Sequence, residues 1–156
     1  MILREIWQPP DEAEDWDEEK LANKIVSSIT EAVQENIQAA IIATPASLHL
    51  DQAKELVNAG VHILIEKPLS HSTMGVNELL EAAEIAGIIG LVGYCLRFDP
   101  GAGKFKEMLD NDLTGQLLHV QVECGSYLPD WRPGRDYRES DSAKAEHGGG
   151  IIMEGV

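Results

Sequence analysis

Three short apolar stretches decide the fold: AAIIA at residues 39–43, VHILI at 61–65 and IIGLV at 88–92. Each is rich in β-branched residues and lacks strict alternation with polar positions, which is typical of parallel strands covered on both faces. Between them, apolar residues recur at helical spacing: Leu50, Ala53, Leu56 and Val57, then Val76, Leu79, Leu80 and Ala83. Gly60 and Gly87 stand where a left-handed residue would end each helix. The pattern predicts a βαβαβ unit of a doubly wound α/β fold.

The residues before the first stretch carry weaker signals. Residues 1–19 combine a short apolar start with Pro9-Pro10 and an acidic cluster, so we expect a solvated loop. From Glu18, the spacing of Leu21 and Ile25 predicts a short helix. The run from Ser28 to Glu31 reads as a capping box that begins another helix.

The pattern changes after Pro100. A short helix is predicted around Phe105, Met108 and Leu109, followed by a turn at 111–115. Residues 118–124 then alternate apolar and polar, which predicts a half-buried strand of an antiparallel sheet. Residues 127–150 are rich in Pro, Gly, Arg and Asp and predict a long functional or disordered loop. We therefore expect one domain over 1–112 and the beginning of a second over 113–156.

Composition excludes several classes of protein. The 156 residues include 27 acidic and 12 basic side chains, for a net charge of -15, which argues against nucleic acid or an anionic membrane as partner. No apolar run approaches the roughly 20 residues of a membrane helix. Two cysteines, no signal peptide and no metal-ligand spacing of His and Cys predict a cytoplasmic protein without a metal site.

In an open parallel sheet, ligands bind beyond the carboxyl ends of the strands. The residues in that position are Thr44-Pro45-Ala46, Glu66-Lys67-Pro68 and the run from Tyr94 to Phe98. Lys67, between a carboxylate and apolar strand ends, is a candidate acid/base group, and the alternative is a surface Lys–Glu pair. We expect these segments to meet at one edge. The run from His147 to Gly150 is similar to a lipase oxyanion loop, but no G-x-S-x-G elbow accompanies it.

Three motifs resemble the glucose-fructose oxidoreductase / inositol dehydrogenase (Gfo/Idh/MocA) family. They are AIIATPASLH at 40–49, Glu66-Lys67-Pro68, and GYCLRFDP at 93–100, and their order and spacing resemble the family too. WRPGRDYR at 131–138, followed by GGGIIME at 148–154, is similar to the family's entry into its second domain. The resemblance covers roughly residue 20 to the end.

The resemblance implies an enzyme that uses NAD or NADP to oxidise or reduce a hydroxyl of a sugar, cyclitol or sugar derivative. It implies a partial Rossmann domain followed by the start of an α+β domain with an antiparallel sheet. The implied partners are a small polyol or sugar and, in the full-length enzyme, further copies in a homo-oligomer.

The resemblance also implies site residues. Lys67 matches the lysine that lies by the nicotinamide and contacts the reacting hydroxyl, and is the expected catalytic residue. Expected cofactor contacts are Thr44, Pro45, His49, Glu66, Lys67 and Arg97; expected substrate contacts are Lys67, Arg97, Trp131, Tyr137, Arg138 and Glu154. The alternatives are a local hydrogen bond for His49, a structural salt bridge for Arg97 and a solvated loop for residues 131–138.

This sequence departs from the family pattern at three places. It contains no G-x-G-x-x-G to hold a pyrophosphate, Cys95 replaces the usual Asn, and it stops at Val156, where the family continues with a histidine. We therefore expect a fragment lacking the first βα unit and most of the second domain, inactive alone and prone to weak stability or self-association. The alternative function is a non-catalytic remnant or assembly module that keeps the fold.

Overall fold

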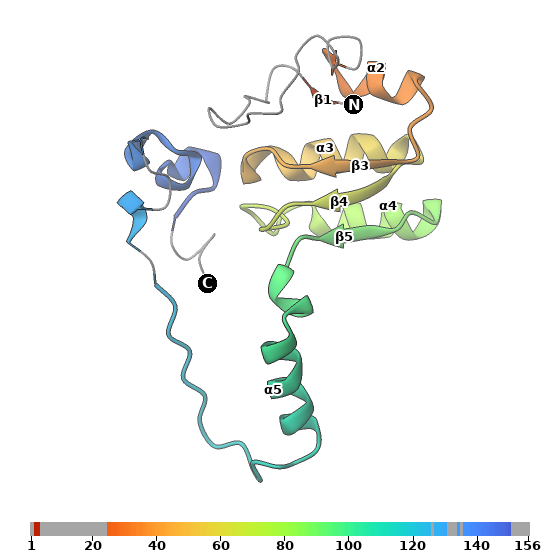
Figure 1. Ribbon diagram of the computed structural model, residues 1–156. Helices are drawn as coiled ribbons and strands as arrows, with labels where there is room; N and C mark the ends of the chain where they lie inside the picture. Colours follow the sequence, from red (N-terminus) through yellow and green to blue (C-terminus); the bar gives the residue numbers. More distant parts are fainter. Residues whose placement is uncertain (1, 4–24, 126, 131–133, 135, 151–156) are drawn as a thin grey trace.

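The computed structural model describes residues 2–3, 25–125, 127–130, 134 and 136–150 (Figure 1). Strands β3 (Ala39–Ile42), β4 (His62–Ile65) and β5 (Gly90–Val92) form a parallel sheet in the order β3-β4-β5. Helix α3 (Ala46–Asn58) connects β3 to β4, and α4 (Val76–Ala86) connects β4 to β5. The predicted parallel βαβαβ unit is confirmed.

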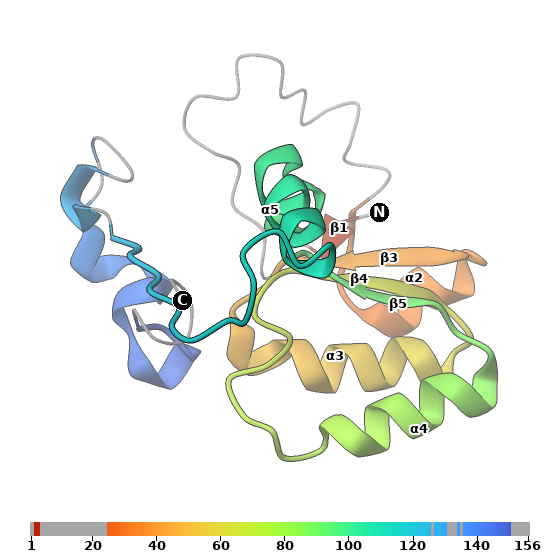
Figure 2. The same ribbon diagram turned by 90° about the horizontal axis from the view of Figure 1, so that it is seen from below.

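The core of this unit lies between the sheet and its two connecting helices, which Figure 2 shows on the same side of the sheet. Ile42, Ile65 and Val92 are paired across the strands and point toward the helices, where Ile42 and Ile65 are buried. Val57 and Ala53 of α3 pack against them. Burial of such side chains is the main stabilising contribution to a unit of this size.

The opposite face of the sheet differs from the prediction. Ile41, Leu64 and Leu91 are paired across the three strands, and Ile41 is 71% and Leu91 60% exposed. Within the described residues, helices therefore cover one face of the sheet and leave the other open. The expectation of cover on both faces was wrong for this part of the chain, because an apolar run shows only that a strand can be buried, not what buries it.

The helix ends follow the sequence closely. Ser28 caps α2 (Ile29–Gln34): its Oγ accepts a bond of 3.1 Å from the N–H of Glu31. The carboxylate of Glu31 accepts from the N–H of Ser27 over 2.8 Å rather than from that of Ser28, so one half of the predicted capping box is formed. Gly60 and Gly87, after α3 and α4, have φ of +79° and +66°, a left-handed conformation that glycine adopts without a Cβ clash. Helix α5 (Pro100–Asp110) confirms the helix predicted around Phe105.

The N-terminal segment corrects two predictions. Ile2–Leu3 (β1) and Ile25–Val26 (β2) pair as parallel strands, with Ile2 opposite Ile25. Ile25 therefore lies in a strand rather than at the end of a helix, and the start of the chain is not all loop. β-Branched residues favour strands, but two-residue strands are too short to give a pattern in sequence. Residues 4–24, with Pro9-Pro10, the acidic cluster and Leu21, lie outside the described residues.

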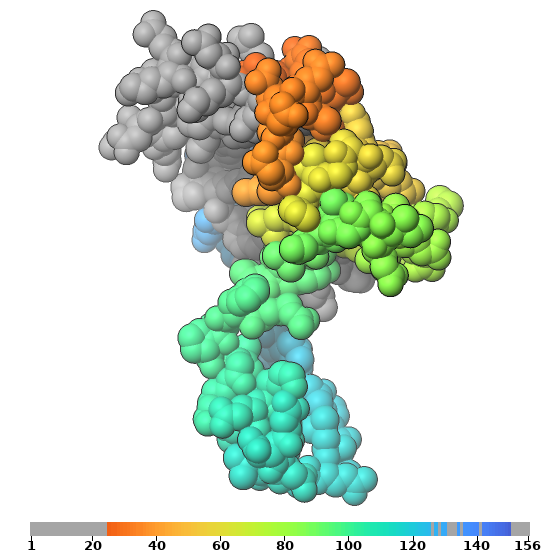
Figure 3. Space-filling view, turned by 90° about the vertical axis from the view of Figure 1, so that its right-hand side faces the viewer, coloured from red at the N-terminus to blue at the C-terminus, as the bar shows by residue number. Residues whose placement is uncertain are grey.

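The strand predicted at 118–124 is not formed. Residues 117–125 have no regular secondary structure, and Leu118, Val120 and Val122 are exposed. A strand needs a hydrogen-bonding partner, and the described residues provide none there. Figure 3 shows α5 projecting from the body formed by the helices α2, α3 and α4, and the segment after it running back from the far end of α5.

The predicted long loop beyond residue 127 contains four short 3₁₀ turns: η2 (Leu128–Asp130), η3 (Tyr137–Glu139), η4 (Asp141–Ala143) and η5 (Ala145–His147). The predicted domain boundary after residue 112 stays a prediction. In the part of the chain that the structure describes, no helix is both long and apolar enough to span a bilayer.

Candidate active site

The segments that follow the three strands lie side by side at the carboxyl edge of the sheet. The N–H of Glu66 donates to the carbonyl of Ile42 over 2.8 Å, and the N–H of Gly93 donates to the carbonyl of Ile65 over 2.8 Å. These two bonds continue the parallel ladder past the last residue of each strand. They fix Glu66 beside the end of β3 and Gly93 beside the end of β4.

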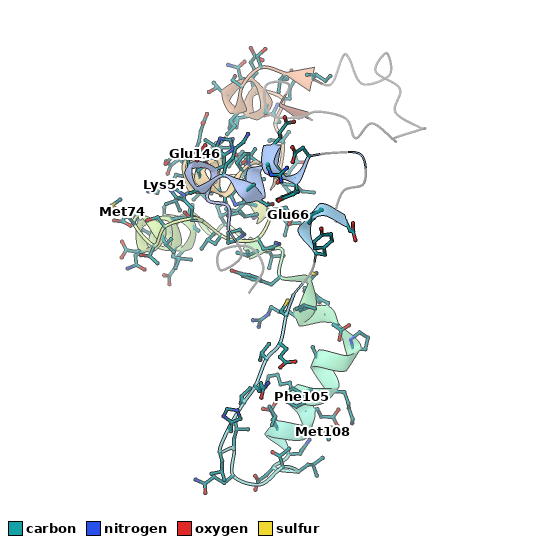
Figure 4. All side chains as sticks on the ribbon, turned by 90° about the vertical axis from the view of Figure 1, so that its left-hand side faces the viewer. Lys54, Glu66, Met74, Phe105, Met108 and Glu146 are labelled. Atoms are coloured by element: carbon teal, nitrogen blue, oxygen red, sulfur yellow. The ribbon has the colours of Figure 1, made fainter. Side chains whose placement is uncertain are left out.

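Glu66 lies between Lys67 and Gly93. Its Oε2 accepts a bond of 3.3 Å from the N–H of Lys67, and a Cβ placed on Gly93 would lie 3.4 Å from the same oxygen. A residue larger than glycine at position 93 would therefore contact the carboxylate. The side chain of Lys67 is exposed at this edge. Glu66 lies well away from Phe105 and Met108 on α5 (Figure 4), so the predicted site belongs to the sheet edge and not to that helix.

His49 joins the first two motifs directly. Its imidazole is 1% exposed, with Nε2 lying 2.7 Å from the carbonyl oxygen of Thr44 and Nδ1 2.8 Å from that of Pro68. The ring therefore bridges the segments after β3 and β4. The prediction that His49 contacts a cofactor stays untested, and both ring nitrogens already have backbone partners.

Thr44 and Pro45 form the turn from β3 into α3. The hydroxyl of Thr44 donates to Oε1 of Gln52 over 2.8 Å, which fixes the turn against the second turn of the helix. Pro45 is the N-cap and makes no side-chain cap bond, and the first turn of α3 carries no acidic residue. The positive end of the α3 dipole is thus directed to the same edge without a neutralising side chain.

The third motif supplies exposed groups. Arg97 lies on the 3₁₀ turn η1 (Cys95–Phe98), which begins three residues after β5, and both Arg97 and Cys95 are exposed. The backbone of Gly93 therefore lies against Glu66, whereas the guanidinium of Arg97, four residues later, is exposed to solvent. The roles predicted for Arg97 in cofactor and substrate binding stay predictions.

The expected substrate residues of the C-terminal segment divide into two groups. Tyr137 and Arg138 lie on η3, where the guanidinium sits 4.9 Å from the centre of the Tyr137 ring and 3.6 Å from Oδ1 of Asp136. The Arg138 side chain therefore contacts the two residues before it, and the carbonyl of Tyr137 accepts a bond of 2.6 Å from the hydroxyl of Ser140. Trp131 and Glu154 lie outside the described residues, and their roles stay predictions.

One contact at this edge was missed. Gly148, with φ of +82°, packs against the start of α3: a Cβ there would lie 3.1 Å from the Cβ of Ala46 and 2.7 Å from that of His71. The turn η5 thereby returns the C-terminal segment to the residues that follow β3 and β4. The glycine run at 148–150 was the available signal, but neither its similarity to an oxyanion loop nor its similarity to the family's entry into a second domain predicts this contact. Among the described residues, no cluster of His, Cys, Asp or Glu could hold a metal ion.

A parallel sheet with helical crossovers, whose candidate groups gather beyond the strand ends, defines the nucleotide-binding class of α/β proteins. Residues 3–94 match the model of the oxidoreductase family with an NAD-binding Rossmann fold, so the chain belongs to the Gfo/Idh/MocA family. The family predicted from the three motifs is confirmed.

Individual relatives agree with this assignment. The chain is 31% identical over 104 residues to the 4-carboxy-2-hydroxymuconate-6-semialdehyde dehydrogenase of Sphingobium sp., covering 65% of this chain and 32% of that protein. It is 28% identical over 136 residues to the 1,5-anhydro-D-fructose reductase of Ensifer adhaerens, covering 84% and 38%. The chain therefore spans about a third of the length of these curated relatives.

A solved structure shows the same fold. The WlbA dehydrogenase of Bordetella pertussis, determined with NADH and UDP-GlcNAcA, superposes with a TM-score of 0.58 at 24% identity. The match covers 64% of this chain and 30% of that one. At this identity the likeness establishes the Rossmann fold and not the substrate.

Proposed function

We propose that this chain forms the nicotinamide-facing part of an oxidoreductase that transfers a hydride between NAD or NADP and a hydroxyl of a sugar, cyclitol or sugar derivative. The observation that carries the proposal is the junction at the carboxyl edge, where His49 bonds the segments holding Thr44-Pro45 and Glu66-Lys67-Pro68. The family match supports NAD as the cofactor, and the name of the Ensifer reductase supports a sugar-like substrate.

The residues at this edge fit one end of such a cofactor. Pro45 offers an apolar surface for a flat ring, and Lys67 offers an ammonium donor beside it on the next strand end. The sequence has no G-x-G-x-x-G turn, so the pyrophosphate end has no matching glycine loop in these residues. When bound, the nicotinamide supplies the acceptor or donor of the hydride.

Lys67 is proposed as the acid/base residue. In the reducing direction its ammonium group donates a proton to the carbonyl oxygen as a hydride adds to the carbon, and in the oxidising direction its neutral amine accepts the hydroxyl proton as the hydride leaves. Glu66 fixes the backbone of Lys67 through the bond of 3.3 Å to its N–H. We propose Thr44 and Arg97 as further residues that contact the cofactor; His49 lies on the same side, and both of its ring nitrogens already have backbone partners.

Substrate binding is proposed for residues that follow the third strand and for the C-terminal segment. Arg97 carries a forked donor suited to vicinal hydroxyls, and the aromatic and guanidinium groups of Trp131, Tyr137 and Arg138 suit a polyol in the same way. Glu154 is proposed as a carboxylate partner of a hydroxyl. We propose a homo-oligomer for the full-length enzyme.

The experiment is cofactor binding by the chain, followed by the Lys67→Ala variant. A cofactor at 100 times its dissociation constant stabilises the folded state by about 2.7 kcal/mol, so NADH or NADPH should raise the melting temperature. Lys67→Ala should keep this stabilisation, because the lysine acts on the hydroxyl. In the full-length enzyme, the Lys67→Ala substitution should lower kcat by about 10²–10⁴, the usual contribution of a general acid or base. Retained turnover would remove Lys67 from the mechanism.

The missing glycine loop favours a second candidate, a non-catalytic module that keeps the fold without the cofactor. It predicts no stabilisation of the 156-residue chain by either nicotinamide cofactor. This second candidate also predicts that the full-length protein is folded but has no turnover with any polyol.

A further inference from the structure

His49 is the only polar side chain that is buried among the residues the structure describes. It lies on the first turns of α3, and its ring contacts backbone atoms of two other segments rather than of its own helix. One partner, the carbonyl of Thr44, follows β3; the other, the carbonyl of Pro68, follows β4. Removing the ring would leave two carbonyl oxygens near the core without their donor, an arrangement that folded proteins avoid.

The chemistry of these two bonds is restrictive. A carbonyl oxygen only accepts hydrogen bonds, so the ring can bond either of these oxygens, at 2.7 Å and 2.8 Å, only as the donor. The imidazolium provides both N–H groups, and either neutral tautomer provides one. No other side chain of similar size places two donors on opposite sides of a flat ring, so the residue is suited to bridging two strand ends.

The segment that His49 holds contains Lys67. At one end, the N–H of Glu66 is bonded to the carbonyl of Ile42; at the other, the carbonyl of Pro68 is bonded to Nδ1 of His49. Lys67 lies between these two anchor points, and its own N–H faces the carboxylate of Glu66. The position of the Lys67 backbone relative to β3 and α3 is therefore set by His49 and Ile42 together.

We propose that His49 is a positioning residue, which holds Lys67 at a fixed place beside Thr44-Pro45 by bonding both strand-end segments at once. The inference rests on the proposed function for what Lys67 does, but not for how it is held. In this proposal the His49 ring does not contact the cofactor. It acts on Lys67 through its bonds to the backbone carbonyls of Thr44 and Pro68.

The test compares His49→Leu with His49→Gln and with Val57→Ala, a matched control on the same helix with an equally buried side chain. The readout is amide hydrogen exchange at Glu66 and at Gly93, which make equivalent ladder bonds of 2.8 Å on neighbouring strands. Exchange of Glu66 relative to Gly93 should rise about tenfold in His49→Leu, because local opening becomes easier at one strand end only.

His49→Gln keeps hydrogen-bond donors on one side of the residue, so exchange of Glu66 relative to Gly93 should rise less than in His49→Leu. Val57→Ala should change both amides by the same factor, since it weakens the whole unit. An unchanged ratio of Glu66 to Gly93 in His49→Leu would overturn the proposal, as would an equal change of this ratio in Val57→Ala.

A second readout connects the bridge to the cofactor. Titration with NADH should shift the amide resonance of Lys67 in the wild-type chain. This shift should fall by about twofold or more in His49→Leu, whereas His49→Gln should retain most of it. A full Lys67 shift in His49→Leu would overturn the functional part of the inference. If NADH shifts no resonance of the wild-type chain, the proposed function fails, and the exchange ratio alone decides whether His49 holds Lys67.

Discussion

Gly148 packs against Ala46, the first residue of α3, so closely that a Cβ on the glycine would lie 3.1 Å from the Cβ of the alanine. This contact joins residues 102 positions apart and places the turn η5 over the start of the helix that follows β3. It brings the C-terminal segment to the edge where Thr44, Pro45 and Pro68 lie.

Gly148→Ala should release η5 from this edge. The new methyl group would lie 2.7 Å from the Cβ of His71, and the φ of +82° disfavours any L residue, so we expect docking to weaken by about 2–4 kcal/mol. Hydrogen exchange at Gly149, whose N–H donates to the carbonyl of Lys144 over 3.0 Å, reports the loss.

Gly134→Ala is the control for this change, because Gly134 has φ of +84° with nothing within 4 Å of its Cβ position. It should leave exchange at Gly149 unaltered. Equal acceleration in the two variants would mean that η5 does not dock on α3.

The core between the sheet and α3 should dominate stability. Ile65 is 2% exposed in the middle of this core, and Ile65→Ala should lower the free energy of unfolding by about 2–5 kcal/mol, the cost of a buried cavity. Ile85→Ala removes the same atoms from a side chain that is 88% exposed and should change it by about 0.5 kcal/mol or less. Urea unfolding of both variants measures the difference, and similar losses would contradict the described core.

The open face of the sheet should make the chain self-associate. Ile41 and Leu91 expose apolar side chains on the same face, and contiguous apolar surface of this kind favours association in water. The double substitution Ile41→Thr with Leu91→Thr puts a β-branched residue at both strand positions and should shift the mass measured by sedimentation toward the monomer. Ile85→Thr is the control, because Ile85 is even more exposed but lies on α4. A wild-type chain that sediments as a compact monomer with a sharp melt would contradict this expectation.

The sequence predicts the parts of the fold that depend on local pattern. The runs ending at Ile42, Ile65 and Val92 are short, apolar and rich in β-branched residues, which predicts strands, and Ser28 and Gly87 mark helix ends through chemistry that is local to each end. The strand expected around Val120 fails because alternation specifies a polar and an apolar face, whereas pairing needs a second strand elsewhere in the chain.

For the candidate site, the sequence predicts which segments meet at the sheet edge but not the contacts between them. Parallel strands necessarily bring Pro45 and Lys67 to one edge, and this was predicted. The bond from His49 to Pro68 spans 19 residues and the contact of Gly148 with His71 spans more, so neither follows from periodicity or spacing. Such contacts depend on how elements pack, which a single sequence does not specify.

The most direct test of the central claim is a map of backbone amide shifts during titration of the ¹⁵N-labelled chain with NADH. The account predicts shifts at Thr44 and Ala46, at Glu66 and Lys67, and at Gly93, all on the carboxyl edge of the sheet. Asn36, Gly60 and Gly87, at the opposite ends of the strands, should stay unchanged. Shifts confined to that opposite edge, or none at millimolar NADH, would contradict the claim that these strand ends form a nicotinamide site.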